Sequence, residues 1–257
     1  MNSIATIPND YQAITSQITS FIKEQAPAGG VVIGISGGID SAIVMGLSVK
    51  ALGADKVTGL LMPQTENDIS PVIKEYVQQL GIHHEILPIG PIVDAYRQYG
   101  HIADDKVVAG NIKARIRMSL LYSRSNASNL VVMGTGNRSE LLAGYFTKYG
   151  DGGVDYLPIG DLYKTQVRGV AKHIGVPEPI ILQPPSAGLW DGQTDEAELG
   201  VSYDTLDAIL FAHTDQNIPF DQINLPGVTK AEIAIVKDRV EKNSFKLALP
   251  KLCQIRK

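Results

Sequence analysis

The chain has 257 residues, enough for one large α/β domain or two small ones. Hydrophobic residues make up 44%, charged residues 19%, and the net charge is −4, a balance that argues against a protein built to coat nucleic acid or an anionic membrane. The single cysteine, Cys253, excludes an internal disulfide framework and a multi-cysteine zinc site. Because the sequence has no signal-peptide pattern and no apolar run near the roughly 20 residues that a bilayer requires, we expect a cytoplasmic protein with no membrane or nucleic-acid partner.

Predicted strands and helices alternate along most of the chain. Apolar residues at positions 14, 18, 21 and 22 predict a helix from Tyr11 to Gln25. Four short apolar runs predict strands, over 31–36, 57–62, 85–89 and 130–134. Helical patterns separate or follow them, over 42–52, 71–80, 107–125, 137–145 and 162–174. This alternation favours a parallel sheet with helices on both faces.

The first strand-to-helix turn carries the clearest chemical signal. The stretch VVIGISGGIDSAIVMGL breaks at Gly37 and Gly38, which let the backbone approach a bound phosphate closely. The turn has no lysine and is therefore not a Walker A loop; hydroxyl groups can bind phosphate here while Asp40 holds a magnesium ion. A glycine-rich turn that merely packs tightly is the structural alternative.

Residues 36–41, SGGIDS, resemble the SGGxDS signature of the N-type ATP pyrophosphatases, in which a substrate attacks the α-phosphate of ATP and pyrophosphate leaves. Within that superfamily, four later segments resemble the ammonia-dependent NAD synthetases, over about residues 15 to 250. They read NIKARIRM (111–118), VVMGTGNRSE (131–140), GYFTKYGDGGVDYLPIGDLYK (144–164) and PSAGLWDGQTDEAELG (185–200). The run YFTKYGDG is the most specific of them.

The resemblance implies a doubly wound, mostly parallel five-stranded sheet with helices on both faces, similar to the adenine nucleotide alpha hydrolases and Rossmann-like. It implies one domain over residues 1–257 with no glutaminase domain, and a homodimer, for which the helix over 107–125 with Met118, Leu120 and Leu121 is our candidate interface. The implied reaction is amidation of deamido-NAD. Its nicotinate carboxylate attacks ATP to form an acyl-adenylate, and ammonia then displaces AMP, giving NAD.

The resemblance also assigns residues. ATP would contact Gly34, Ile35, Ser36, Gly37, Gly38, Ile39, Asp40, Ser41, Thr135, Lys164 and Ser186. Magnesium would be held by Asp40 and Glu140, and deamido-NAD by Arg115, Lys148, Asp155 and Lys246. The catalytic residues would be Asp40, Asp151 and Lys164, with Asp151 near the activated carboxyl group, where it can hold or deprotonate ammonium. The loop over residues 183–194 would close over the nucleotide.

Each assignment has a structural alternative. Glu140 fits a solvated carboxylate in the first turn of a helix, and Lys164 fits a solvated basic stripe with Arg168 and Lys172. For Asp195 and Glu198 we prefer the structural interpretation, a helix start. Trp190 fits either a cover for a base or a packing anchor.

The sequence differs from the family pattern at one place, and two other functions remain as alternatives to NAD synthesis. Bacterial relatives often carry a His-Lys pair where this chain has Phe245-Lys246. A tRNA-modifying enzyme on the same fold would predict a basic face or an added RNA-binding domain. A non-catalytic ATP sensor would need the SGGIDS loop but not Glu140, Lys148, Asp151 and Asp155 together.

Overall fold

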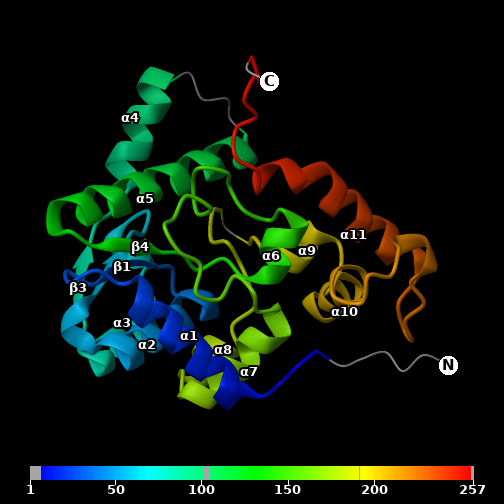
Figure 1. Ribbon diagram of the computed structural model, residues 1–257. Coiled ribbons are helices and arrows are strands. Elements are labelled where there is room, and N and C mark those ends of the chain that lie inside the picture. The colour runs from blue at the N-terminus through cyan, green and yellow to red at the C-terminus, as the bar shows by residue number, and fades with distance from the viewer. Residues whose placement is uncertain (1–6, 101–104, 191, 256–257) are drawn as a thin grey trace.

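The computed structural model describes residues 7–100, 105–190 and 192–255. Its centre is a four-stranded parallel sheet with the strand order β3-β2-β1-β4 (Figure 1). β1 (Val31–Ile35) pairs with β2 (Val57–Leu61) on one side and β4 (Val131–Met133) on the other, and β3 (His83–Ile86) forms the outer edge beside β2. All three pairings are parallel, as the alternation of strands and helices predicts.

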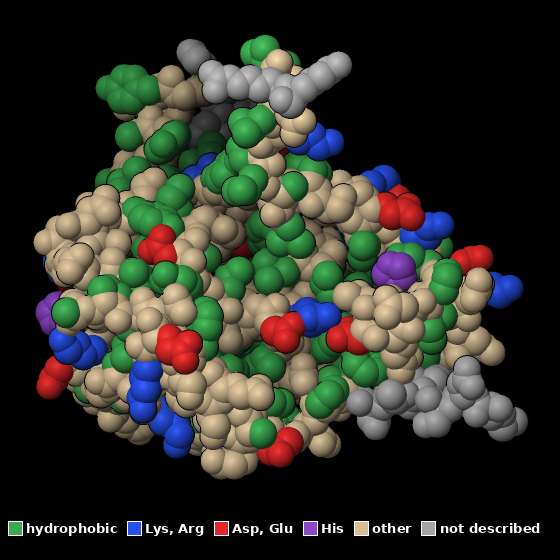
Figure 2. Space-filling model, in the orientation of Figure 1, with side chains coloured by type: hydrophobic (Ala, Val, Ile, Leu, Met, Phe, Trp, Pro, Cys, Tyr) green, Lys and Arg blue, Asp and Glu red, His purple; other side chains and the backbone are tan. Residues whose placement is uncertain are grey.

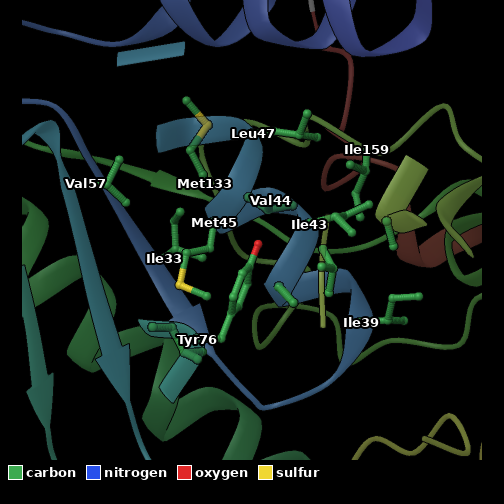
Figure 3. Packing of buried hydrophobic residues seen from close by; sticks show 14 of the residues in the cluster. Ile33, Ile39, Ile43, Val44, Met45, Leu47, Val57, Tyr76, Met133 and Ile159 are labelled. Atoms are coloured by element: carbon green, nitrogen blue, oxygen red, sulfur yellow. The ribbon is translucent and has the colours of Figure 1, made fainter. Parts of the chain in front are cut away.

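Helices cover one face of the sheet and enclose the largest core. They are α1 (Tyr11–Gln25), α2 (Ile39–Leu52), α3 (Pro71–Leu80), α7 (Lys164–Ile174) and α8 (Glu178–Ile181). Figure 3 shows Ile43, Val44 and Leu47 of α2 packed with Ile33 of β1 and Tyr76 of α3. Because side chains alternate along a strand, the odd-numbered residues of β1 enter this core and Val32 enters the core on the opposite face.

The opposite face and the C-terminal part complete the fold. α4 (Gly90–Gly100) and α5 (Lys106–Ser128) lie on the second face of the sheet. α6 (Arg138–Ala143), α9 (Asp195–Leu199), α10 (Tyr203–Thr214) and α11 (Lys230–Asn243) share a separate hydrophobic cluster beside it. Single 3-10 turns occur at Ala54–Lys56, Glu66–Asp68, Phe220–Gln222 and Ser244–Lys246. None of the described helices is long and apolar enough to cross a membrane.

The expectation of five strands is wrong, because the described residues form four. The fifth position is reduced to a single parallel bridge between Met133 and Tyr156. Here the Asp155 carboxylate accepts the N–H of Val132 at 2.8 Å, in the place of a backbone carbonyl. Pro158, which cannot donate a ladder hydrogen bond, follows two residues after Tyr156. A side chain therefore ends the strand pairing before a fifth strand can form.

Several predicted boundaries are confirmed and others shift. α1 and α3 have the predicted limits, with Asp10 capping α1 and Gly81 in the left-handed conformation after α3. β3 begins at His83, two residues before the predicted start, because the first residues of this edge strand are polar and exposed. α4, α10 and α11 were not predicted.

Candidate active site

A large cleft opens at the carboxyl ends of β1, β2 and β4, the edge at which ligands bind in open α/β sheets. Its volume is about 1260 Å³, which exceeds the roughly 300–1,000 Å³ typical of a pocket for one small molecule. The loop after β1, the 144–154 segment and the 183–193 loop all line it. The cleft therefore has room for two substrates side by side.

The loop over residues 36–38 forms one wall of the cleft. Gly37 has φ +91°, a conformation that favours glycine, and Gly38 begins α2 without a side-chain cap. The Ser41 hydroxyl is buried, donates to the carbonyl of Gly38 at 3.0 Å and accepts the N–H of Ser36 at 3.3 Å. Ser36 lies exposed on the cleft wall. Ser41 therefore shapes the loop, whereas Ser36 and the uncapped helix start face the cleft, where an anion can bind.

Three charged residues meet at the floor of the cleft. The Lys164 ammonium lies 2.5 Å from one Asp40 oxygen and 3.3 Å from one Glu140 oxygen. The Lys164 side chain is only 2% exposed, so it does not belong to a solvated stripe with Arg168 and Lys172. Although 124 residues separate Asp40 from Lys164, the sheet brings them together. This convergence is the most direct support for the predicted phosphate end of the site.

Asn137 holds the second oxygen of each carboxylate. Its side-chain amide donates to Asp40 at 3.0 Å, and its backbone N–H donates to Glu140 at 3.1 Å. Asn137 is the N-cap of α6 and forms a capping box with Glu140. Glu140 thus lies in the first turn of a helix, as the structural interpretation predicts, but its side chain is only 16% exposed and is not solvated. Its role as a magnesium ligand stays a prediction. We did not single out Asn137 from the sequence, although the N-x-x-E spacing in GNRSE is readable as a capping box.

Burial and charge act in opposite directions at this centre. Burial alone would lower the pKa of Lys164, but the charges of Asp40 and Glu140 outweigh it and raise that pKa, so Lys164 stays a cation. Burial raises the pKa of Glu140, and the Lys164 charge opposes the shift. The site therefore favours a positive charge between its two carboxylates.

Asp195 is a third carboxylate beside this centre. It begins α9, as the structural interpretation predicts, but it is 4% exposed and lines the cleft. Its two oxygens accept the hydroxyls of Tyr145 at 3.1 Å and Tyr203 at 3.0 Å. Burial raises the pKa of Asp195, while Lys164 lowers it. A helix-start pattern alone does not reveal that this carboxylate faces the site.

The opposite end of the cleft contains Asp151 and Lys246. One Asp151 oxygen accepts the N–H of Thr147 at 2.9 Å, and the depth of the cleft raises the pKa of Asp151. Lys246 donates to the carbonyls of Gly144 at 2.6 Å and Phe146 at 3.0 Å. Burial lowers the pKa of Lys246, whereas the charge of Asp151 raises it. Asp151, predicted to act on ammonium, and Lys246, predicted to contact deamido-NAD, thus lie on the same wall of the cleft.

Arg115, Lys148 and Asp155 lie outside the lining of the cleft. Arg115 is exposed and donates to the carbonyl of Lys148 at 3.3 Å. Lys148 donates to the carbonyls of Phe245 and Ala248, each at 2.8 Å, and so ties down the C-terminal segment.

Asp155 accepts the Tyr122 hydroxyl at 2.9 Å with the oxygen that does not bind Val132. Burial, followed by this hydrogen bond, raises the pKa of Tyr122 to about 12. The two oxygens of the Asp155 carboxylate therefore bind α5 and β4 in this structure.

Arg117 faces the cleft two residues after Arg115. Its Nε donates to the carbonyl of Met62 at the end of β2, at 3.0 Å. Burial lowers the pKa of Arg117, and the charge of Asp151 opposes the shift. The periodicity of α5 does not distinguish the two arginines, because their surroundings come from β2 and the 147–154 segment.

The 183–193 loop lies against the start of α5. Lys113 donates to the carbonyl of Leu189 at 2.8 Å, and a Cβ added at Gly110 would lie 3.0 Å from Leu189 and 3.3 Å from Trp190. Trp190 therefore packs beside α5 and also lines the cleft, and the choice between a packing anchor and a cover for a base stays a prediction. Thr135 and Ser186 both line the cleft, and Ser186 accepts the N–H of Gly188 at 3.1 Å. Residue 191 lies outside the described residues.

The family model described as NAD synthase matches residues 10–250 of this chain. The chain belongs to the NAD synthase family. A curated ammonia-dependent NAD(+) synthetase from Pyrococcus horikoshii is 47% identical over 94% of both chains. Among solved structures, the ammonia-dependent NAD synthetase of Campylobacter jejuni is 35% identical with a TM-score of 0.80, over 95% of this chain and 100% of that one.

Another solved structure similar to this chain is an enzyme with a different activity in its name. It is the NMN synthetase of Francisella tularensis, 32% identical with a TM-score of 0.84, over 96% of this chain and 99% of that one. These matches confirm both the resemblance to ammonia-dependent NAD synthetases and the α/β architecture, with four strands rather than five.

Proposed function

We propose that this protein is an ammonia-dependent NAD synthetase that uses ATP to amidate deamido-NAD. The observation that carries the proposal is the meeting of Asp40, Glu140 and Lys164 at the floor of a cleft large enough for two substrates. The nicotinate carboxylate attacks the α-phosphorus of ATP and pyrophosphate leaves. Ammonia then attacks the carbonyl carbon of the acyl-adenylate, and AMP leaves with the former carboxylate oxygen.

The chain's own groups suit the first step. The uncapped start of α2 and the Ser36 hydroxyl supply donors for the departing pyrophosphate, and Lys164 supplies a fixed positive charge. Thr135 and Ser186 add hydroxyl groups along the same cleft. The loop that packs on α5 shields the mixed anhydride from water.

Magnesium fits the residues at the floor of the cleft. Carboxylate oxygens are the ligands that Mg²⁺ prefers, and the ammonium bound between Asp40 and Glu140 supports a cation site at this position. The described residues contain no group of three or more acidic, histidine or cysteine side chains that could hold a metal, so phosphate oxygens would complete the coordination. The bound ion would neutralise charge on the phosphates.

Asp151 suits the second step. Ammonium must lose a proton before its nitrogen can attack, and a carboxylate whose pKa is raised is a better acceptor for that proton near neutral pH. Lys246 lies on the same wall and is the assigned deamido-NAD residue that lines the cleft. We expect Arg115 and Lys148 to reach the dinucleotide from the rim, and the role of Asp155 in substrate binding stays a prediction.

We also propose a homodimer. Exposed hydrophobic side chains on α4, the start of α5 and the C-terminal segment support it, including Tyr99, Val107 and Leu249 (Figure 2 shows such side chains gathered on the upper part of the molecule). Leu120 and Leu121 are partly buried and pack against the core beside the sheet, and the place of the 107–125 helix in the interface stays a prediction. Size-exclusion chromatography with light scattering tests the dimer. The single-domain organisation and cytoplasmic location stay predictions.

The direct test supplies purified protein with ATP, Mg²⁺, deamido-NAD and ammonium, and measures NAD, AMP and pyrophosphate. Parallel reactions replace ammonium with glutamine, or deamido-NAD with nicotinic acid mononucleotide. We expect equal amounts of the three products with ammonium and deamido-NAD. ATP binding without any product would contradict the proposed reaction and favour a non-catalytic ATP sensor. Faster reaction with nicotinic acid mononucleotide would show that the mononucleotide, and not deamido-NAD, is the substrate.

A further inference from the structure

The Lys164 ammonium is enclosed among carboxylates. It contacts Asp40 and Glu140, and its Nζ lies 5.0 Å from the centre of the Tyr203 ring. The backbone of Lys164 is fixed, because its N–H donates to the Ser139 hydroxyl at 2.9 Å. Only the four-carbon side chain can therefore move the charge, and a lysine side chain is flexible enough to do so.

The two carboxylates have matched partners. Each has one oxygen held by Asn137 and the other by Lys164. Within the described part of the chain, no other lysine or arginine forms an ion pair with either carboxylate. Asn137 is buried and held in place as the N-cap of α6, so Lys164 is the partner that can leave.

We propose that Lys164 and the divalent metal ion compete for the same oxygens of Asp40 and Glu140. Binding the Lys164 ammonium and a metal ion at this position together is unfavourable, because their electrostatic repulsion is weakly screened in a buried site. The phosphates of ATP draw the lysine away and supply oxygen ligands to the metal at the same time. The protein therefore binds the metal with the nucleotide rather than before it, an ordering that rests on the proposed function.

The experiment measures Mn²⁺ binding without nucleotide, from the electron paramagnetic resonance signal of the free ion. The wild type is compared with Lys164→Met and with Lys172→Met, which removes an exposed charge from the same helix. We expect Lys164→Met to bind Mn²⁺ at least about tenfold more tightly than the wild type, and Lys172→Met to match the wild type. Adding Asp40→Asn to Lys164→Met should abolish the gain.

Equal or weaker Mn²⁺ binding by folded Lys164→Met would overturn the proposal. So would tight, nucleotide-free binding to the wild type that Asp40→Asn removes, a result that needs no folded lysine variant. Circular dichroism verifies the fold of each variant. NAD formation by the same wild-type preparation separates the two proposals. If NAD forms but Mn²⁺ binding does not change as expected, the competition between Lys164 and the metal ion is wrong while the synthetase activity stands.

Discussion

The two ends of the cleft use their lysines differently. At the floor, Lys164 is buried and paired with carboxylates from distant parts of the chain. At the other end, Lys246 on the wall and Lys148 outside the lining both donate to backbone carbonyls. These hydrogen bonds join the 144–148 segment to the C-terminal segment. A carbonyl fixes an ammonium group without cancelling its charge. The first arrangement prepares a cation site, and the second leaves positive charge for an anionic substrate.

The largest effect should come from the carboxylate end. Asp40→Asn removes the charge opposite Lys164, and we expect pyrophosphate release to fall about 1,000-fold. Quenched assays of radiolabelled ATP measure this step. Asp204→Asn, which changes an exposed carboxylate paired with Arg168, should leave the rate unchanged. An unaltered rate for Asp40→Asn would remove Asp40 from the adenylation chemistry.

Asp151→Ala should separate the two steps. Without the carboxylate that we assign as the proton acceptor, ammonium should react more slowly, so we expect NAD formation to slow about 100-fold while ATP binding changes little. Stopped assays for NAD, beside equilibrium titration of ATP, measure both quantities. If the two fall together, Asp151 supports the cleft as a whole rather than the amidation step.

The loop should respond to a change on α5. Gly110→Val places a side chain against Leu189 and Trp190, and overpacking of this kind costs about 1–3 kcal/mol. We expect the KM for ATP to rise about tenfold. Because Trp190 is the single tryptophan, its fluorescence emission should shift to longer wavelength. Ser119→Ala, on an exposed position of α5, is the control, and an unshifted spectrum in Gly110→Val would contradict loop docking on α5.

The smallest effect should come from the C-terminal segment. Lys148→Met removes two hydrogen bonds from a charged donor at a partly exposed site, worth about 1 kcal/mol. The KM for deamido-NAD should rise about threefold to fivefold, and limited proteolysis should cut the segment after residue 244 sooner. Lys251→Met alters an exposed lysine of the same segment and should change neither quantity. Equal proteolysis of the Lys148→Met and wild-type proteins would show that these hydrogen bonds do not hold the segment.

Sequence patterns predicted the four strands and placed SGGIDS at the first strand-to-helix turn, because these features depend on local signals. The roles of the residues at the phosphate end stay predictions. Apolar strands, helix caps and the SGGIDS turn are short stretches whose chemistry is readable without the fold. The dinucleotide end was harder, because the partners come from other elements: Lys148 binds backbone carbonyls of the C-terminal segment, and Asp155 binds the Tyr122 hydroxyl and the N–H of Val132. The missing fifth strand has the same cause: Asp155 replaces a ladder carbonyl, which no periodicity reveals.

The most direct test of the account follows oxygen from substrate to product. Deamido-NAD labelled with ¹⁸O in its nicotinate carboxylate is converted with ATP, Mg²⁺ and ammonium, and the AMP is analysed by mass spectrometry. Attack of the carboxylate on the α-phosphorus predicts one ¹⁸O atom in AMP for each NAD formed from fully labelled substrate. Unlabelled AMP, or label in inorganic phosphate, would contradict adenylation in this cleft.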